Sequence, residues 1–249
     1  MNRMNSEFTP HQVEWTSEKV KRFWDYFVTN EQLLELAASN TIGDGVIELC
    51  KPYLRHDARM LDFGCGGGGL IGKLIEKGFP VEGCDSSEAS VETTRRRFGS
   101  QPLFKGAFLS GAPAASNISD ATYDFIFSLE MIEHLLPDEI DATFREFSRI
   151  LKPGGYLLVS TPNGERLEKY KVICPDCGAI FHRVQHLNSY TPKRLSEIGS
   201  SAGLAPILNW TGLLTPQGTW IDSLKKTIRR LLPSTNKFAP HLIYIGQKQ

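Results

Sequence analysis

The sequence predicts an α/β fold in which a mostly parallel sheet is covered by helices on both faces. Short apolar strands alternate with helical segments from about residue 59 to residue 160, and this alternation is typical of right-handed strand–helix–strand units. The strand expected at residues 123–129 (YDFIFSL) is almost entirely apolar, as expected when both of its faces are buried. A chain of 249 residues is long enough for one such domain with additional elements.

Three helices are expected before the first strand. The first begins near Ser17, the second is capped by Asn30, and the third covers about residues 45–54, each with apolar residues at helical spacing. We therefore predict a helical N-terminal extension over residues 1–55, followed by the main domain over residues 56–249.

The strands and helices of the main domain are predicted from apolar runs and from turn residues. Strands are expected at residues 59–63, 80–84, 103–109, 123–129 and 156–160, and helices between them at residues 70–78, 87–98 and 138–151. A further helix and two strand-like stretches are expected at residues 191–203, 207–210 and 241–246. Residues 162–190 break the alternation and are interpreted as an insertion.

Composition and charge limit the classes of protein to consider. The chain has 28 Lys and Arg residues against 28 Asp and Glu residues, so no nucleic-acid partner is expected. No apolar run approaches the ~20 residues of a membrane-spanning helix, and the first ten residues have no apolar core of a secretory signal. Five cysteines do not indicate a disulfide framework, so a cytoplasmic location is expected.

A glycine-rich segment is the strongest functional motif. The segment from Asp62 to Gly68 (DFGCGGG) follows one predicted strand and leads into a predicted helix. Glycines let a ligand approach the backbone, and Asp85 at the end of the next strand is placed to accept hydrogen bonds from ribose hydroxyls. The glycine run alone also satisfies the dinucleotide pattern G-x-G-x-x-G, through Gly64, Gly66 and Gly69.

A series of motifs in the chain resembles class I S-adenosylmethionine-dependent methyltransferases, and in particular the group that includes ubiquinone-biosynthesis O-methyltransferases. The motifs are, in order, RMLDFGCGGGG, VEGCDSS, YDFIFSLEMIEHL and LKPGGYLLVSTPN. Together they cover roughly residues 58–163. The resemblance implies a doubly wound, Rossmann-like sheet of seven strands whose last strand is antiparallel.

The resemblance also implies a set of cofactor-binding residues. Asp62 would orient the methionine amino end of the cofactor, Asp85 would hold the ribose, and Leu129 would line the reactive end. The full set is Asp62, Gly64, Cys65, Gly66, Gly68, Asp85, Ser86, Phe108 and Leu129. The chain departs from the family after the third strand, where Lys105–Phe108 replaces the usual acidic contact to adenine, so backbone atoms and stacking by Phe108 are expected to recognise that base.

The E-x-x-E-H segment contains Glu130, Glu133 and His134. If a helical turn begins after the strand, the three side chains share one face and suit a divalent cation such as Mg²⁺, as the resemblance also implies. His134 is the predicted catalytic residue, since a near-neutral pKa suits a general base. Alternatively, the segment makes only local hydrogen bonds and shapes the substrate entrance.

Cysteine and histidine residues cluster in the insertion. Cys174, Cys177, His182 and His186 follow the pattern C-x2-C-x4-H-x3-H, which predicts a compact structural zinc site with four protein ligands. The alternative is two unpaired thiols and two surface histidines, and one of these histidines could instead face the substrate.

A basic amphipathic helix is predicted near the C-terminus, over about residues 221–232. It would either pack on the domain or make weak peripheral contact with anionic lipid.

The sequence as a whole predicts an S-adenosylmethionine-dependent methyltransferase that acts on a small-molecule acceptor, with oxygen as the expected methylated atom. The alternative is a cofactor-binding or zinc-bearing interaction protein that has this fold and transfers no methyl group.

Overall fold

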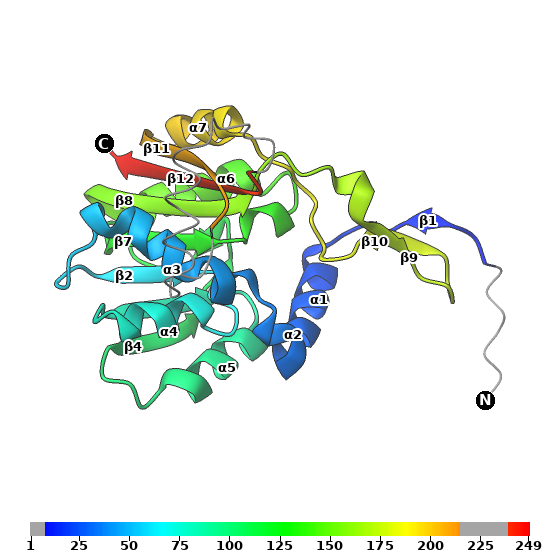
Figure 1. Cartoon of the computed structure of the whole chain (residues 1–249), viewed down its shortest axis with the longest axis horizontal. Helices are drawn as coiled ribbons and strands as arrows, with labels where there is room; N and C mark the ends of the chain where they lie inside the picture. Colours follow the sequence, from blue (N-terminus) through cyan, green and yellow to red (C-terminus); the bar gives the residue numbers. More distant parts are fainter. Residues whose placement is uncertain (1–7, 215–238) are drawn as a thin grey trace, which may run out of the picture.

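The computed structural model describes residues 8–214 and 239–249, and a seven-stranded sheet forms its centre (Figure 1). The strand order across the sheet is β11-β12-β8-β7-β2-β3-β4. The bounds are β2 (Met60–Phe63), β3 (Val81–Asp85), β4 (Phe104–Leu109), β7 (Tyr123–Leu129), β8 (Leu151–Pro162), β11 (Leu204–Gly212) and β12 (His241–Lys248).

The direction of the strands confirms the predicted fold class. The pairs among β2, β3, β4, β7 and β8 are parallel, whereas β12 is antiparallel to both β8 and β11. The parallel pairs require crossover connections, which the intervening helices supply. This doubly wound arrangement with one reversed strand is the one that the sequence predicts.

Helices cover both faces of the sheet. On one face α3 and α4 pack against the sheet through Ile42 and Leu70, and on the other α6 and α7 pack through Phe144 and Leu195. The helices are α1 (Ser17–Thr29), α2 (Glu31–Glu35), α3 (Ala38–Cys50), α4 (Gly69–Glu76), α5 (Glu88–Phe98), α6 (Ile140–Ile150) and α7 (Pro192–Ser201), with single turns η1 (Lys51–Tyr53), η2 (Ile132–His134) and η3 (Leu167–Tyr170). A two-stranded hairpin, β5 (Gly111–Ala112) with β6 (Ala115–Ser116), follows β4.

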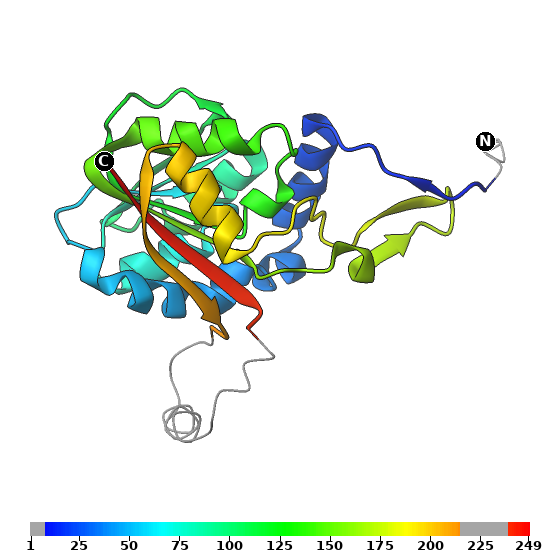
Figure 2. The ribbon, with the colours of Figure 1, turned by 90° about the horizontal axis from the view of Figure 1, so that it is seen from above.

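The insertion forms a hairpin that projects from the body of the molecule (Figures 1 and 2). Its strands β9 (Lys171–Ile173) and β10 (Ala179–His182) are antiparallel, and β1 (His11–Gln12) adds a parallel third strand beside β10. Figure 2 shows α1 between this hairpin and the central sheet. The N-terminal extension is therefore helical, as predicted, apart from its short strand, while its separation at residue 55 as a unit of its own stays a prediction.

Two of the predicted helices lie at the start and near the end of the chain. The third N-terminal helix begins at Ala38, earlier than predicted, and ends at Cys50, where the turn η1 that contains Pro52 begins. The amphipathic helix predicted at residues 221–232 lies outside the described residues. In the part that is described, no helix has the length and apolar character needed to cross a membrane.

Candidate functional site

The loop between β2 and α4 is shaped by glycine and by Asp85. Gly64 has a φ of +81°, which other residues rarely adopt, and a Cβ there would come within 2.7 Å of Met131 Cγ. The Asp85 carboxylate accepts hydrogen bonds from the backbone N–H groups of Gly66 and Ser87, both at 2.9 Å. The loop therefore presents bare backbone beside the half-buried Asp85 carboxylate.

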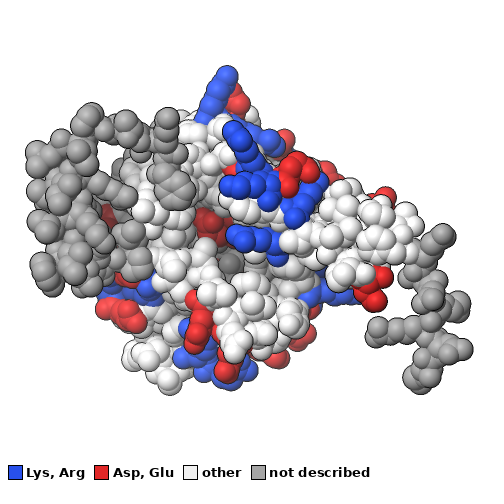
Figure 3. All heavy atoms as spheres, turned by 45° about the vertical axis from the view of Figure 1, so that its right-hand side comes forward, with Lys and Arg blue, Asp and Glu red and all other residues white. Residues whose placement is uncertain are grey.

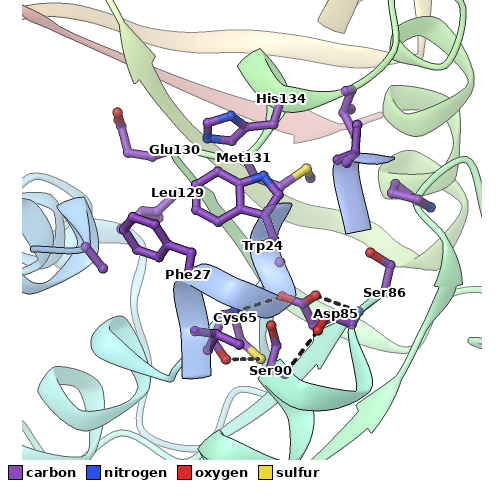
Figure 4. A pocket seen from close by; sticks show the side chains of 18 of the residues that line it. Trp24, Phe27, Cys65, Asp85, Ser86, Ser90, Leu129, Glu130, Met131 and His134 are labelled. Carbon is purple, nitrogen blue, oxygen red and sulfur yellow. Dashed lines mark hydrogen bonds between the residues drawn. The ribbon is translucent and has the colours of Figure 1, made fainter. Parts of the chain in front are cut away.

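A cavity of about 620 Å³ lies at the carboxyl ends of the parallel strands, where ligands bind in open α/β sheets. Figure 4 shows Asp85 and Cys65 at one end of this cavity and His134 and Glu130 at the other. Its volume is in the range of small-molecule sites. The predicted cofactor residues on its wall are Gly64, Cys65, Gly66, Asp85, Ser86 and Leu129.

Three predicted cofactor residues lie away from this wall. Asp62 is buried beneath the loop, where desolvation and the neighbouring Asp85 raise its pKa to about 8. Gly68 faces α5, since a Cβ on it would meet the ring of Phe98 at 2.6 Å. Phe108 packs into the core on the α6 side of the sheet, so the structure does not bring it to the cavity to stack on an adenine. Residues 110–113 form the cavity wall there instead.

Helix α1 closes one side of the cavity. Trp24 and Phe27 line it, and the Trp24 indole ring lies 4.5 Å from the His134 ring, edge to face. The Trp24 Nε1–H donates to Gln185 Oε1 at 2.8 Å. The sequence indicated an apolar face on this helix, but gave no sign that the face would line a site instead of packing into the core.

The E-x-x-E-H segment is not one continuous helical face. Glu130 has a φ of +49°, and η2 begins only at Ile132. Glu130 therefore lies outside the turn that contains Glu133 and His134. Its carboxylate instead accepts a hydrogen bond from the Ser160 hydroxyl at 2.8 Å. In the described part of the chain, the ligand atoms of Glu133 and His134 converge with His186, and Glu130 does not join this group.

Burial shifts the pKa of the titratable side chains on η2 and of Glu130, which precedes it. Burial, and then the negative charge of Glu130, raise the pKa of Glu133 well above its usual range. Burial raises the pKa of Glu130 to about 6. Burial, and then the nearby His186, hold the pKa of His134 well below its usual value. A neutral His134 keeps a nitrogen lone pair available to a ligand.

The end of the insertion is attached to η2 by backbone contacts. The Glu133 carbonyl accepts from the N–H groups of Leu187 and Asn188, at 2.8 and 3.1 Å. The Gln185 side chain donates to the His134 carbonyl at 3.0 Å. These bonds place His186 on the wall of the same cavity.

The predicted zinc site of Cys174, Cys177, His182 and His186 is not assembled. The two cysteines lie in the turn between β9 and β10, whereas His182 ends β10. Because a strand advances about 3.3 Å per residue, the extended β10 carries His182 away from the thiols. His182 and His186 gather with Glu165 instead, and in the described part of the chain no cysteine joins a group of three possible ligands.

Comparison with known proteins identifies the family to which the chain belongs. A model of the methyltransferase domain matches residues 17–209. The ubiquinone biosynthesis O-methyltransferase of Azoarcus sp. (strain BH72) is 29% identical over 161 residues, which make up 64% of this chain and 66% of that protein. The protein of the same name from Paracidovorax citrulli (strain AAC00-1) is 28% identical over 173 residues, 66% of each chain. The chain thus spans just under two thirds of the length of these relatives.

Solved structures share the fold at low identity. A putative methyltransferase of Haloferax volcanii, solved with the Trm112 activator, has a TM-score of 0.65 at 16% identity and covers 92% of this chain and 96% of its own. The 1,6-didemethyltoxoflavin-N1-methyltransferase of Burkholderia thailandensis has a TM-score of 0.63 at 14% identity, with coverage of 100% and 98%. Fold, motifs and family match agree: this chain belongs to the S-adenosylmethionine-dependent methyltransferases.

Proposed function

We propose that this protein transfers the methyl group of S-adenosylmethionine to a hydroxyl oxygen of a small aromatic acceptor. The observation that carries the proposal is the single cavity that joins the glycine loop and Asp85 to an aromatic and imidazole end. One end suits a nucleoside and the other suits a flat ring, as Figure 4 makes visible.

The residues of the cofactor end fit S-adenosylmethionine. Asp85 is a half-buried carboxylate at the end of β3, so it can accept from both ribose hydroxyls in exchange for its present bonds to the loop. The loop backbone at Gly64 and Gly66 leaves room that side chains would fill. When bound, the cofactor supplies a methyl group on a positively charged sulfur.

The acceptor end favours an aromatic ring. Trp24, Phe27 and Met131 line this end, and aromatic and thioether side chains pack well against planar rings. Charge of both signs is mixed on the face seen in Figure 3, which offers no uniformly basic surface to a polyanion. The protein's part in the reaction is to align the donor and the acceptor, and His134 supplies a lone pair where the hydroxyl proton must leave.

The reaction balances without a covalent enzyme intermediate. The acceptor oxygen forms the new C–O bond as the C–S bond breaks, and the electron pair of that bond stays on sulfur. The hydroxyl proton passes to the lone pair of His134 and from there to solvent. The products are a methyl ether and S-adenosylhomocysteine.

A test uses purified protein, S-adenosylmethionine and panels of phenolic, sugar and lipid acceptors. We expect S-adenosylhomocysteine release with a phenolic acceptor, together with a product heavier by one methylene group in mass spectrometry. Asp85→Ala serves as the inactive control. Absence of turnover with every panel would contradict the proposal, and so would co-purification of a dinucleotide in place of S-adenosylmethionine or its product.

A further inference from the structure

Two cysteines lie together at the tip of the hairpin that projects from the body of the molecule (Figure 1). Cys174 follows β9 directly, and Cys177 lies in the turn that leads to β10. Cys174 is half-buried and Cys177 is exposed. The methyl transfer proposed above makes no use of this pair.

The turn that contains the two thiols is closed by backbone hydrogen bonds. The Cys174 N–H donates to the Ala179 carbonyl at 2.8 Å, and the Gly178 N–H donates to the Cys174 carbonyl at 2.9 Å. Gly178 has a φ of +80°, and a Cβ on it would overlap the Thr9 carbonyl, so glycine suits this position. The fold therefore holds both sulfurs on one tight turn without a cross-link.

The surroundings of Cys174 favour its thiolate form. The backbone N–H of Cys177 and then that of Asp176 donate to the Cys174 sulfur, and the Cys177 thiol adds a third hydrogen bond, so the pKa of Cys174 is lowered. The thiolate is the reactive form of cysteine. An accessible thiolate beside a second thiol is the usual arrangement of a redox-active pair.

The other three cysteines have the opposite environment. Cys50, Cys65 and Cys84 are buried, and burial raises the pKa of each of their thiols. Thiols buried in this way are inert. The structure thus separates the five cysteines of the chain into one accessible pair and three protected residues.

A metal ion on this pair would need ligands that the turn does not supply. In the described part of the chain, no cysteine belongs to a group of three possible ligands, whereas structural zinc sites use four. The two thiols are therefore available for thiol chemistry.

We propose that Cys174 and Cys177 form a thiol–disulfide exchange site that is oxidised by low-molecular-weight disulfides such as glutathione disulfide. The Cys174 thiolate attacks one sulfur of glutathione disulfide, and a glutathione thiolate leaves. The Cys177 sulfur then gives up its proton, attacks the Cys174 sulfur and displaces the second glutathione. Two protein thiols are oxidised to one disulfide, glutathione disulfide is reduced to two thiols, and the two protons pass to these thiols.

The exchange site is joined to the N-terminal strand. The Gly178 carbonyl, next to Cys177, accepts the His11 N–H at 3.0 Å, and the Ile180 carbonyl accepts the Val13 N–H at 3.0 Å. This strand, β1, leads into α1, which lines the cavity. Because a cross-link restricts the freedom of an opened segment, we expect the disulfide to strengthen the pairing of β1 with β10.

Oxidation of the reduced, full-length protein with glutathione disulfide, followed by alkylation and mass spectrometry, tests the site. We expect a protein lighter by two hydrogen atoms, with a bond between Cys174 and Cys177 and with the three buried cysteines still present as thiols. Dithiothreitol should restore both thiols. Amide hydrogen exchange at His11 and Val13 should be slower in the oxidised form.

Two matched serine variants separate the roles of the two thiols. Cys177→Ser keeps the backbone N–H that donates to Cys174, so this variant should accumulate glutathione bound to Cys174. Cys174→Ser lacks the activated thiolate and should take up glutathione at least about 10-fold more slowly. Circular dichroism and an unchanged affinity for S-adenosylmethionine check that both variants are folded.

The proposal is overturned if the reduced protein forms no disulfide between Cys174 and Cys177, if the two variants react at equal rates, or if the buried cysteines react first. A protein that is isolated with zinc on both thiols and resists glutathione disulfide would overturn it too. Equal hydrogen exchange in the two forms would contradict the link to β1. These readouts need no methyl transfer, so their failure is distinct from a failure of the proposed function.

Discussion

The Asp85 carboxylate is bonded to two backbone N–H groups at the entrance of the glycine loop. Asp85→Ala removes the acceptor proposed for the cofactor ribose, so S-adenosylmethionine binding should weaken by about 1–3 kcal/mol, the scale of a charge-assisted hydrogen bond. Isothermal calorimetry measures the change. Asp57→Ala, at an exposed acid, is the control and should bind normally. Unchanged affinity in Asp85→Ala would contradict the placement of the ribose.

Asp62 makes the stability of the unliganded protein depend on pH. Its pKa is about 8 when folded and about 4 when unfolded, so the folded state holds this proton more tightly. The stabilisation is complete below about pH 4 and is lost as the pH rises through 8. Asp62→Asn should therefore lose less stability than the unaltered protein between pH 5 and pH 8 in urea unfolding. Parallel pH profiles for the two proteins would contradict the assignment.

The segment at residues 185–190 depends on Gln185, which bridges α1 and η2. Gln185→Ala leaves the Trp24 indole N–H and the His134 carbonyl without their partner, and each unsatisfied buried group costs about 1–3 kcal/mol. We expect a lower urea midpoint and faster hydrogen exchange at residues 182–190. Gln101→Ala, on an exposed turn, is the comparison, and an equal effect of the two substitutions would argue against the bridge.

The elements that sequence predicts best are those whose signal is local. The strand Tyr123–Leu129 has the predicted bounds because its residues form one continuous apolar run. The E-x-x-E-H face could not be predicted, since the positive φ of Glu130 breaks the register between strand and turn. His186 lies beside Glu133 and His134, and only long-range docking of the insertion brings it there.

The zinc site was predicted wrongly for a similar reason, because the local spacing does not show the secondary structure of its histidines. The spacing of His182 and His186 suits one helical turn, but His182 belongs to a strand that pairs with β9. The local pattern does not show which conformation each residue adopts, so it could not predict that the cysteines and the histidines lie apart.

The whole molecule should be stabilised by S-adenosylhomocysteine, the product that remains when the cofactor has lost its methyl group. S-Adenosylhomocysteine at about 100 times its Kd should add about 2.7 kcal/mol, which for a chain of this size raises the Tm by about 5–10 °C. Differential scanning calorimetry with and without ligand measures this shift. NAD at the same concentration should leave the Tm unchanged, and an equal shift with NAD would favour the dinucleotide interpretation of the glycine run.

The parallel pairing of β1 with β10 has a consequence for biosynthesis. During translation β1 emerges before its partner at residues 179–180, which follows only after β2 through β8 have left the ribosome. Contacts so distant along the chain carry a large loop-closure cost and form late. The parallel strands β2 through β8 can thus pair before β1 meets β10, and β1, which leads into the cavity-lining helix α1, is fixed in place late in folding.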